Sequence, residues 1–177
     1  MRLERDPKQR RLDENYIRAS RKLAGHFYVL TNGEHTGNRG VNTIVDQSFA
    51  SWPPQYAHEH GLYLPGLAAG GVQWQDCFGS LAHPGVTPEE MDFLRSIPNI
   101  METELSKLLK YAPYHLNDSE ITKVLSIIVL GNMVSPTVNI GSLYDDFADN
   151  RVGYIQLQTT VMTLMSELLE RAKQQGL

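Results

Sequence analysis

Hydrophobic residues near the start of the chain recur every three or four positions, which is the spacing of one face of an α-helix. They are Leu12, Tyr16, Ala19, Leu23 and Phe27. Asp6 is a suitable N-cap, and Pro7 fits the first helical turn, where its missing N–H costs nothing. Asn32 and Gly33 form a turn signal after the stripe. The pattern predicts an amphipathic helix within residues 7–30.

The hydrophobic pattern breaks up over residues 31–86, where turn-forming residues dominate. This segment holds nine of the fourteen glycines, four of the nine prolines and both tryptophans. A short strand is predicted at Val41–Val45, and Gly61–Leu67 is a weaker candidate because Pro65 cannot donate a backbone hydrogen bond. Loops of this length are uncommon in compact domains unless they bind something. The segment is therefore a candidate binding region.

Hydrophobic residues again recur at helical spacing after residue 86, and prolines divide this part of the chain into segments. Thr87, Pro88 and Glu90 supply an N-cap, a first-turn proline and a capping-box acid, so a helix is expected to begin here. This helix is expected to end before Pro98, because proline inside a helix removes a backbone hydrogen bond. A second helix is expected to follow it and to end at Pro113.

Two more long helices are predicted after residue 113, and a short helix from Gly141 or Ser142 to Ala148 is a candidate between them. Asn117 and Glu120 have capping-box spacing, and the apolar stretch that follows predicts a helix buried on most sides that runs to about residue 134. The last helix is predicted over residues 152–175, with hydrophobic side chains around nearly half of its circumference. A face this wide suits packing against two elements or a dimer interface. The candidate interface residues are Tyr154, Leu157, Val161, Leu164 and Leu168.

Together these patterns predict a mainly α fold, a bundle of about four to five helices with a long loop-rich insertion. A single domain is expected over residues 1–177. It comprises a basic amphipathic helix at 7–30, a glycine- and aromatic-rich irregular region at 31–86 that can carry short β-strands, and a helical bundle at 87–177. No apolar run approaches the roughly 20 residues of a membrane span, and no secretory signal is recognised. The one cysteine, Cys77, cannot form an internal disulfide, so a cytoplasmic location is expected.

Charge is distributed unevenly along the chain, whose formal net charge is −4. Residues 1–25 hold eight basic and four acidic side chains, whereas the remainder holds eight basic and sixteen acidic ones. The basic end suggests contact with nucleic acid or with an acidic protein partner. The residues on the basic edge of the predicted helix are Arg11, Arg18, Arg21 and Lys22. Because acids are interleaved with them, a solvated face is the alternative interpretation.

Five of the six histidines lie between residues 26 and 83. On a strand, His58 and His60 would share one face, and two imidazoles there could bind Zn²⁺ with His35 and Cys77 as further ligands. An open coordination position would activate water for hydrolysis, with a neighbouring glutamate as base. The spacing differs from the helical H-E-x-x-H arrangement, so the alternative is that these histidines are surface loop residues. No other cofactor is expected.

The glycine-rich segments match neither the P-loop nor the dinucleotide-binding fingerprint, so they are interpreted as turns. The leading hypothesis is a non-enzymatic assembly or interaction protein that binds protein partners, its own copies included. A structural or accessory protein of a phage or mobile element would fit this description. Two alternatives stay open. One is a metal-dependent hydrolase centred on His58 and His60, and the other is a nucleic-acid-binding accessory protein that uses the basic helix.

Overall fold

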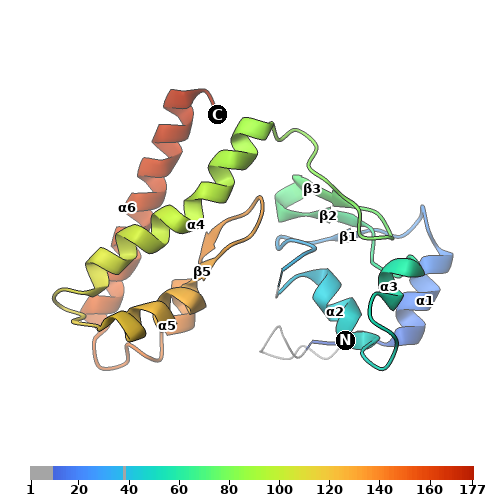
Figure 1. The fold of residues 1–177 in the computed structure, drawn as a ribbon, viewed down its shortest axis with the longest axis horizontal. Coiled ribbons are helices and arrows are strands. Elements are labelled where there is room, and N and C mark those ends of the chain that lie inside the picture. Colours follow the sequence, from blue (N-terminus) through green and yellow to red (C-terminus); the bar gives the residue numbers. More distant parts are fainter. Residues whose placement is uncertain (1–9, 38) are drawn as a thin grey trace. The chain divides into compact units, whose positions relative to one another are not determined.

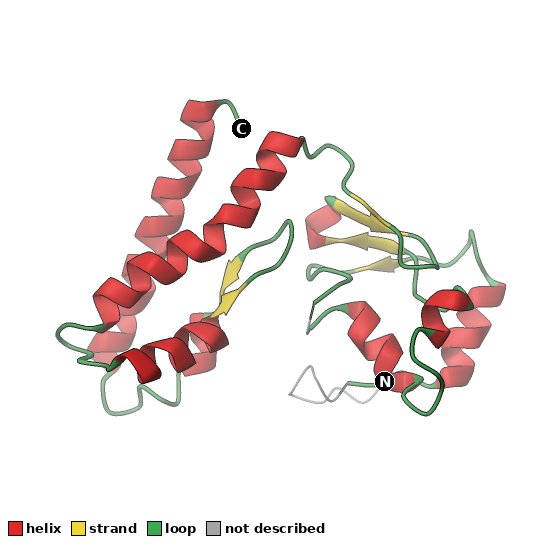
Figure 2. Ribbon diagram, in the orientation of Figure 1, coloured by secondary structure: helices red, strands yellow, loops and turns green. Residues whose placement is uncertain are grey.

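The computed structural model describes residues 10–37 and 39–177, and the chain divides into two compact units (Figures 1 and 2). Unit 1 comprises residues 1–86 and unit 2 comprises residues 87–177. The boundary coincides with the expected start of the helical bundle. Each unit has a hydrophobic core of its own. The single-domain expectation and the mainly α fold class stay predictions.

The first helix, α1 (Glu14–Lys22), is shorter than expected. It starts after Asp13, whose carboxylate accepts hydrogen bonds from the two backbone N–H groups that follow Glu14, and the predicted cap at Asp6 and Pro7 falls outside the described residues. Residues 1–9 lie outside the part of the chain that is described. The predicted apolar stripe is correct only at its ends: Leu12 and Phe27 pack against the core of unit 1, but the buried residues of α1 are Ile17 and Ser20, and Leu23 is 54% exposed.

The predicted strand at 41–45 is instead the start of helix α2 (Val41–Ser48). Val41, Val45 and Phe49 are four residues apart, and this spacing places all three on the side that packs in the core of unit 1. Periodicity over five apolar residues does not distinguish a buried strand from a buried helix. Helix α3 (Tyr56–Glu59) follows, and the core combines residues from all three helices and from the chain that follows α2 and α3: Ile17, Val45, Phe49, Ala57, Leu62 and Leu64.

Unit 1 contains a four-stranded sheet in the order β1-β2-β3-β4. The strands are β1 (Val29–Leu30), β2 (Gly66–Ala68), β3 (Gln73–Gln75) and β4 (Leu81–Ala82). β1 and β2 are parallel, and the other two pairs are antiparallel. The weak strand candidate at 61–67 is correct only at its end, because β2 begins immediately after Pro65, which cannot donate to the ladder.

Unit 2 begins with one long helix, α4 (Pro88–Leu109), where two were expected. The capping box is confirmed, because the Thr87 hydroxyl accepts from the Glu90 N–H and the Glu90 carboxylate accepts from the Thr87 N–H. Pro98 lies inside the helix and does not end it. The buried residues Ile97 and Met101 flank the proline on the packed face, and tertiary packing of this kind outweighs the loss of one backbone hydrogen bond.

Helix α5 (Asp118–Ile128) starts at the predicted Asn117 capping box but ends earlier than expected. The chain becomes extended at Val129 and forms a hairpin from β5 (Val129–Leu130) and β6 (Thr137–Val138). A 3₁₀ turn, η3 (Ile140–Leu143), follows the hairpin.

The last helix, α6 (Arg151–Gln175), agrees with the prediction to within a residue at each end. Its expected interface residues are used inside unit 2. Leu157, Val161 and Leu168 are buried in the core that α4 and α5 complete, and Tyr154 and Leu164 pack against the same core. These side chains are therefore not a free dimer surface.

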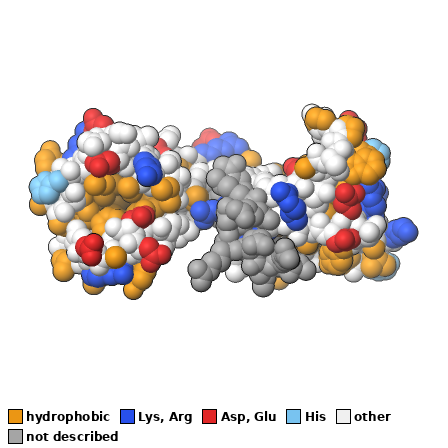
Figure 3. Space-filling model, turned by 90° about the horizontal axis from the view of Figure 1, so that it is seen from below, with side chains coloured by type: hydrophobic (Ala, Val, Ile, Leu, Met, Phe, Trp, Pro, Cys, Tyr) orange, Lys and Arg blue, Asp and Glu red, His pale blue; other side chains and the backbone are white. Residues whose placement is uncertain are grey.

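The surface of unit 2 still carries large hydrophobic side chains among charged ones, as Figure 3 shows for one face. Met162 and Leu169 on α6 are 64% and 56% exposed. None of the helices in residues 10–37 and 39–177 is both long enough and apolar enough to cross a membrane.

Candidate functional site

The carboxyl ends of the two parallel strands meet at one edge of the sheet in unit 1 (Figure 1). In sheets with parallel strands, ligands bind outside this edge, in the loops that leave the strands. Two loops leave it here, and both are rich in glycine: residues 31–37 after β1, and the 3₁₀ turn η2 (Ala69–Gly71) after β2. We call these two segments the edge loops.

Backbone and side-chain hydrogen bonds fix the edge loops against each other. The Ala69 N–H donates to the Gly33 carbonyl over 3.0 Å, and the Thr31 N–H donates to the Leu67 carbonyl over 3.1 Å. The Thr31 Oγ1 accepts from the Gly33 N–H at 3.2 Å. Because this oxygen acts as the acceptor, the hydroxyl hydrogen of Thr31 is available to a ligand.

The second edge loop has an unusual backbone. Ala69, Gly70 and Gly71 have φ values of 50°, 67° and 100°, so three consecutive residues lie in the region that favours glycine. Because Ala69 has a Cβ, this backbone conformation is strained and costs free energy. Backbone strain of this kind clusters at ligand-binding positions. A Cβ added to Gly70 or Gly71 would meet no heavy atom within 4 Å. The loop therefore has open space on the side where Gly70 and Gly71 lack a side chain, and successive backbone N–H groups in turns can bind anions.

His35 anchors the first edge loop from inside the unit. Its side chain is fully buried, its Nε2 lies 3.0 Å from the Gly66 carbonyl, and its backbone N–H donates to the Gln73 side chain over 2.8 Å. A carbonyl can only accept, so Nε2 carries the proton and Nδ1 carries a lone pair. This Nδ1 is buried and has no hydrogen-bond partner. Burial lowers the pKa of the imidazole from its ordinary value, opposed by the bond to Gly66.

Two fully buried amides on β3 hold the same loop and the start of α2. Gln73 accepts from His35, and its amide nitrogen lies 3.3 Å from the His83 Nε2. Gln75 exchanges two hydrogen bonds with the Asn42 side chain, at 2.6 and 2.9 Å. Buried polar groups of this kind specify one arrangement when they are satisfied. The first edge loop and the start of α2 are therefore both held by side chains of β3.

The buried imidazole gives a testable pH dependence. Because the folded-state pKa of His35 is lowered, the unfolded chain takes up a proton below about pH 6.5 that the folded chain does not. We expect the free energy of unfolding to fall from pH 7.5 to 5.5, measured by urea unfolding. His35→Gln keeps a donor for Gly66 without titrating, so its curve should be flatter. Equal slopes in the two proteins would contradict this assignment.

The residues expected to hold zinc are not brought together. His58 lies in α3 and His60 is its C-cap, so the strand on which the two imidazoles were to share a face is wrong. Two residues apart on a helix, they point in directions about 200° apart. His60 stacks on Tyr56 at 4.1 Å, and its Nδ1 lies 3.0 Å from the Tyr56 carbonyl.

His35 is buried against Gly66, as described, and Cys77 is a half-buried free thiol. Within residues 10–37 and 39–177, no three His, Cys, Asp or Glu side chains gather closely enough to hold a metal ion. The zinc hypothesis stays a prediction without support from this geometry.

Of the four basic residues predicted to contact nucleic acid or an acidic partner, three interact with other residues of unit 1. The Arg18 guanidinium lies 5.1 Å from the ring centres of Phe49 and Trp52 and 3.6 Å from the Glu14 carboxylate, and its Nη1 donates to the Tyr56 hydroxyl over 3.2 Å. The bond to Tyr56 is the main cause of its raised pKa. Arg11 donates to the Gln47 carbonyl, and Arg21 lies over the Phe78 ring. Contact with nucleic acid or an acidic partner stays a prediction.

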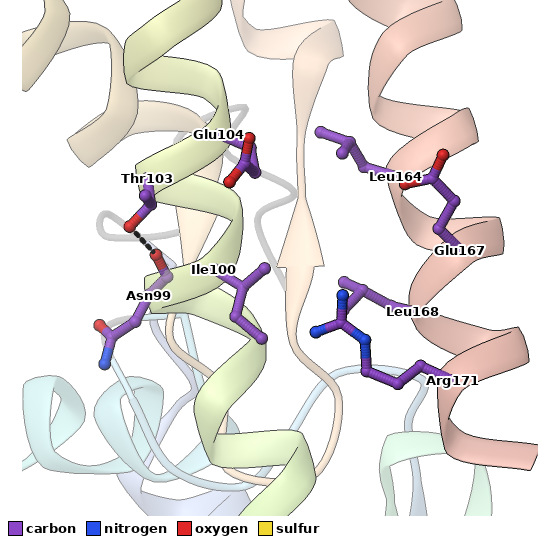
Figure 4. A pocket seen from close by; sticks show the side chains of 8 residues that line it. All are labelled: Asn99, Ile100, Thr103, Glu104, Leu164, Glu167, Leu168 and Arg171. Atoms are coloured by element: carbon purple, nitrogen blue, oxygen red, sulfur yellow. Dashed lines mark hydrogen bonds between the residues drawn. The ribbon is translucent and has the colours of Figure 1, made fainter. Parts of the chain in front are cut away.

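A hollow lies in unit 2, between α4 and α6 (Figure 4). It has a volume of about 450 Å³, within the range of small-molecule sites. Its lining combines an apolar floor with polar and charged groups: Asn99, Ile100, Thr103, Glu104, Leu164, Glu167, Leu168 and Arg171. We call it the α4–α6 hollow.

Comparison with known proteins shows which family this chain is similar to. A family model described as glucosylglycerol-phosphate phosphatase matches residues 1–177. The chain is also 44% identical over 177 residues to a curated glucosylglycerol-phosphate phosphatase from Synechocystis sp.. The match covers all of this chain and 42% of the relative, so the chain spans about two fifths of that protein's length. No solved structure matches.

These matches overturn the leading hypothesis from the sequence. A non-enzymatic assembly or accessory protein is wrong, because the similarity over the whole chain is to an enzyme family.

The sequence shows the edge loops only as glycine-rich turns. The strand β1, which precedes the first of them, is only two residues long and leaves no strand pattern in the sequence. The parallel pairing of β1 with β2, which makes the turns a candidate site, joins residues that are distant in sequence.

Proposed function

The chain belongs to the glucosylglycerol-phosphate phosphatase family, and from this premise we propose that it hydrolyses the phosphate ester of glucosylglycerol. The edge loops hold the phosphoryl group in this proposal. Water attacks phosphorus, the ester P–O bond breaks, and the leaving oxygen takes a proton to give glucosylglycerol and inorganic phosphate. The observation that carries the proposal is the family match over residues 1–177.

The edge loops support a phosphoryl site by their chemistry. Phosphoryl transfer depends mainly on positioning and on stabilising negative charge on the phosphoryl oxygens. Backbone N–H groups and neutral hydroxyls supply such stabilisation when they are held in place before the reaction. Thr31 offers its hydroxyl hydrogen, and Gly70 and Gly71 present open backbone on the facing loop.

The rigid support beneath the loops fits the same role. His35 is neutral and buried, and Gln73 fixes its backbone N–H. A loop anchored in this way loses little conformational entropy when it binds an anion. More of the binding free energy is therefore available to stabilise the transition state. His35 and Gln73 are therefore positioning residues rather than catalytic ones.

We propose a cytoplasmic location for this reaction. The single half-buried thiol of Cys77 is compatible with a reducing compartment, where unpaired cysteines persist. Self-association, the other expectation drawn from the sequence, stays a prediction.

The first test measures inorganic phosphate released from glucosylglycerol phosphate by the purified chain, in buffer that contains Mg²⁺. We expect release by the wild-type chain. Thr31→Val keeps the side-chain shape and removes the donor, so it should lower kcat/KM by about 100-fold, the usual loss for one donor to a developing oxyanion.

The matched control is Thr159→Val on α6, whose hydroxyl donates to the Ile155 carbonyl on an exposed face. It should leave phosphate release unchanged. Urea unfolding of both variants separates loss of a donor from loss of structure. A wild-type chain that releases no phosphate, or a folded Thr31→Val protein with wild-type kcat/KM, would contradict the proposal.

A further inference from the structure

The residue that follows β4 lies at the same edge of the sheet as the edge loops. β1 and β2 are parallel, and β3 is antiparallel to both β2 and β4, so β4 runs in the same direction as β1 and β2. The carboxyl ends of these three strands therefore meet at one edge, where ligands bind. The edge loops follow two of the ends, and His83 follows the third, immediately after Ala82. The topology thus places an imidazole beside the edge loops.

One carboxamide joins His83 to the first edge loop. Trp74 pairs with Ala82, so the antiparallel register places Gln73 opposite His83. The side chains of opposed residues lie on the same face of a sheet. Gln73 accepts a hydrogen bond from the His35 backbone N–H over 2.8 Å, and its amide nitrogen lies 3.3 Å from the His83 Nε2. Only this carboxamide therefore separates the imidazole from the backbone of the loop.

The same contacts determine which nitrogen of His83 carries the hydrogen. A backbone N–H can only donate, so the Gln73 atom that faces His35 is the oxygen and the atom that faces His83 is the nitrogen. An amide nitrogen also only donates, so the His83 Nε2 accepts and the neutral ring carries its hydrogen on Nδ1. His83 consequently presents an uncharged N–H donor at the ring position that does not face Gln73.

The Nδ1–H group of His83 is available to a ligand. Within residues 10–37 and 39–177, the ring has no hydrogen bond other than that with Gln73. The buried side-chain atoms that lack a partner in this part of the chain are the His35 Nδ1 and the Gln47 Oε1. The His83 Nδ1 is not among them, so it reaches the surface, although the side chain as a whole is half-buried. A donor that is held in place and has no acceptor in the protein suits a ligand oxygen.

The charged side chains near the first edge loop supply no net positive charge for a phosphoryl group. Glu34 is 5% exposed within the loop, and Arg39 is an exposed residue just beyond it. Their formal charges cancel. Stabilisation of the phosphoryl oxygens then depends on uncharged N–H and O–H donors that are already in position, and His83 is one such donor.

We propose that the Nδ1–H group of His83 donates a hydrogen bond to an oxygen of the phosphoryl group that the edge loops hold. This inference rests on the proposed function. His83 stabilises negative charge in this role and does not supply the proton that the leaving oxygen takes. All the groups involved lie in unit 1.

Two substitutions of His83 test this role, because each keeps a different part of the chemistry of the ring. His83→Gln places a carbonyl oxygen where Nε2 accepts and removes the Nδ1–H donor. His83→Asn keeps an N–H group near the position of Nδ1 and removes the acceptor. Isothermal titration calorimetry of the full chain with inorganic phosphate compares them. We expect His83→Gln to weaken phosphate binding about tenfold and His83→Asn to remain within about twofold of the wild type.

A role limited to supporting Gln73 predicts the opposite order, because only His83→Asn would then lose the important contact. That order overturns the inference. Wild-type phosphate affinity in His83→Gln, or a wild-type chain that does not bind phosphate, also overturns it. The matched control is His58→Gln, which replaces an exposed histidine of α3 and should keep wild-type affinity.

Nitrogen NMR of the imidazoles gives a second measurement. Long-range ¹H–¹⁵N spectra at neutral pH, with the His83 signals identified by their absence from His83→Gln, should show the hydrogen on Nδ1. A hydrogen on Nε2 contradicts the inference. Neither measurement requires hydrolysis. If the wild-type chain releases no phosphate from glucosylglycerol phosphate but binds phosphate through His83, the proposed activity fails and the phosphate contact of His83 stands.

Discussion

Replacing Gly66 with alanine is expected to destabilise unit 1 by about 3 kcal/mol or more. Gly66 opens β2 with φ 151°, and an added Cβ would overlap the backbone of Val29 on the parallel neighbour β1. Relief would require the two strands to separate. That movement would break the hydrogen bond from Val29 to the Pro65 carbonyl and displace the carbonyl that His35 holds.

Tryptophan fluorescence during urea unfolding measures this effect, because Trp52 and Trp74 are the only tryptophans in the chain and both lie in unit 1. We expect the midpoint to move down by about 1 M or more. Gly33→Ala is the control, since its added Cβ would meet only the Thr31 Oγ1 at 3.9 Å. A Gly66→Ala protein that unfolds at the wild-type midpoint would show that β1 and β2 are not paired as described.

The second large effect is expected in unit 2, from Leu157→Ala. Leu157 is fully buried on α6, in the core that α4 and α5 complete. Truncation removes its buried methyl groups and leaves a cavity, a change that costs about 2–5 kcal/mol. Circular dichroism during urea unfolding should show a lower midpoint for the loss of helix.

Leu169→Ala on the same helix provides the comparison. Leu169 is 56% exposed, so its truncation should change the free energy of unfolding by less than about 1 kcal/mol. The contrast also tests whether this face of α6 is packed inside unit 2. If Leu157 were at an oligomer surface, its truncation would weaken association at low protein concentration and leave the fold of the single chain intact.

The parts of the fold that the sequence predicts well are those set by local chemistry. The capping boxes at Thr87 and Asn117 were correct because a side chain three residues away supplies the partner. The long helix α6 was correct because its apolar spacing persists over many turns. In each case the interactions that decide the structure lie within a few residues of each other.

The errors arose where distant contacts decide the structure. Pro98 lies within α4 because the buried residues on both sides of it keep the helix packed. Val41–Val45 is helical because Phe49 extends the pattern beyond the window, onto the core of unit 1. Val129 leaves the predicted helix because it pairs with Val138 in a hairpin.

The candidate site was visible in the sequence only as composition. Thr31, Gly33, Gly70 and Gly71 were counted as turn residues, and nothing local indicates that the two turns meet. Their meeting depends on the parallel pairing of β1 with β2, two very short strands about 36 residues apart in the chain. The spacing of His58 and His60 resembles that of metal ligands, but in the structure His35 is a buried anchor and not a ligand beside them.

The central claim is that the edge loops hold the phosphoryl group. An amide ¹H–¹⁵N NMR titration of the full chain with glucosylglycerol phosphate tests it most directly. We expect saturable shifts of the amides of residues 31–37 and 69–71, and loss of these shifts when glucosylglycerol without phosphate is added instead. A titration that saturates while these amides stay in place would contradict it.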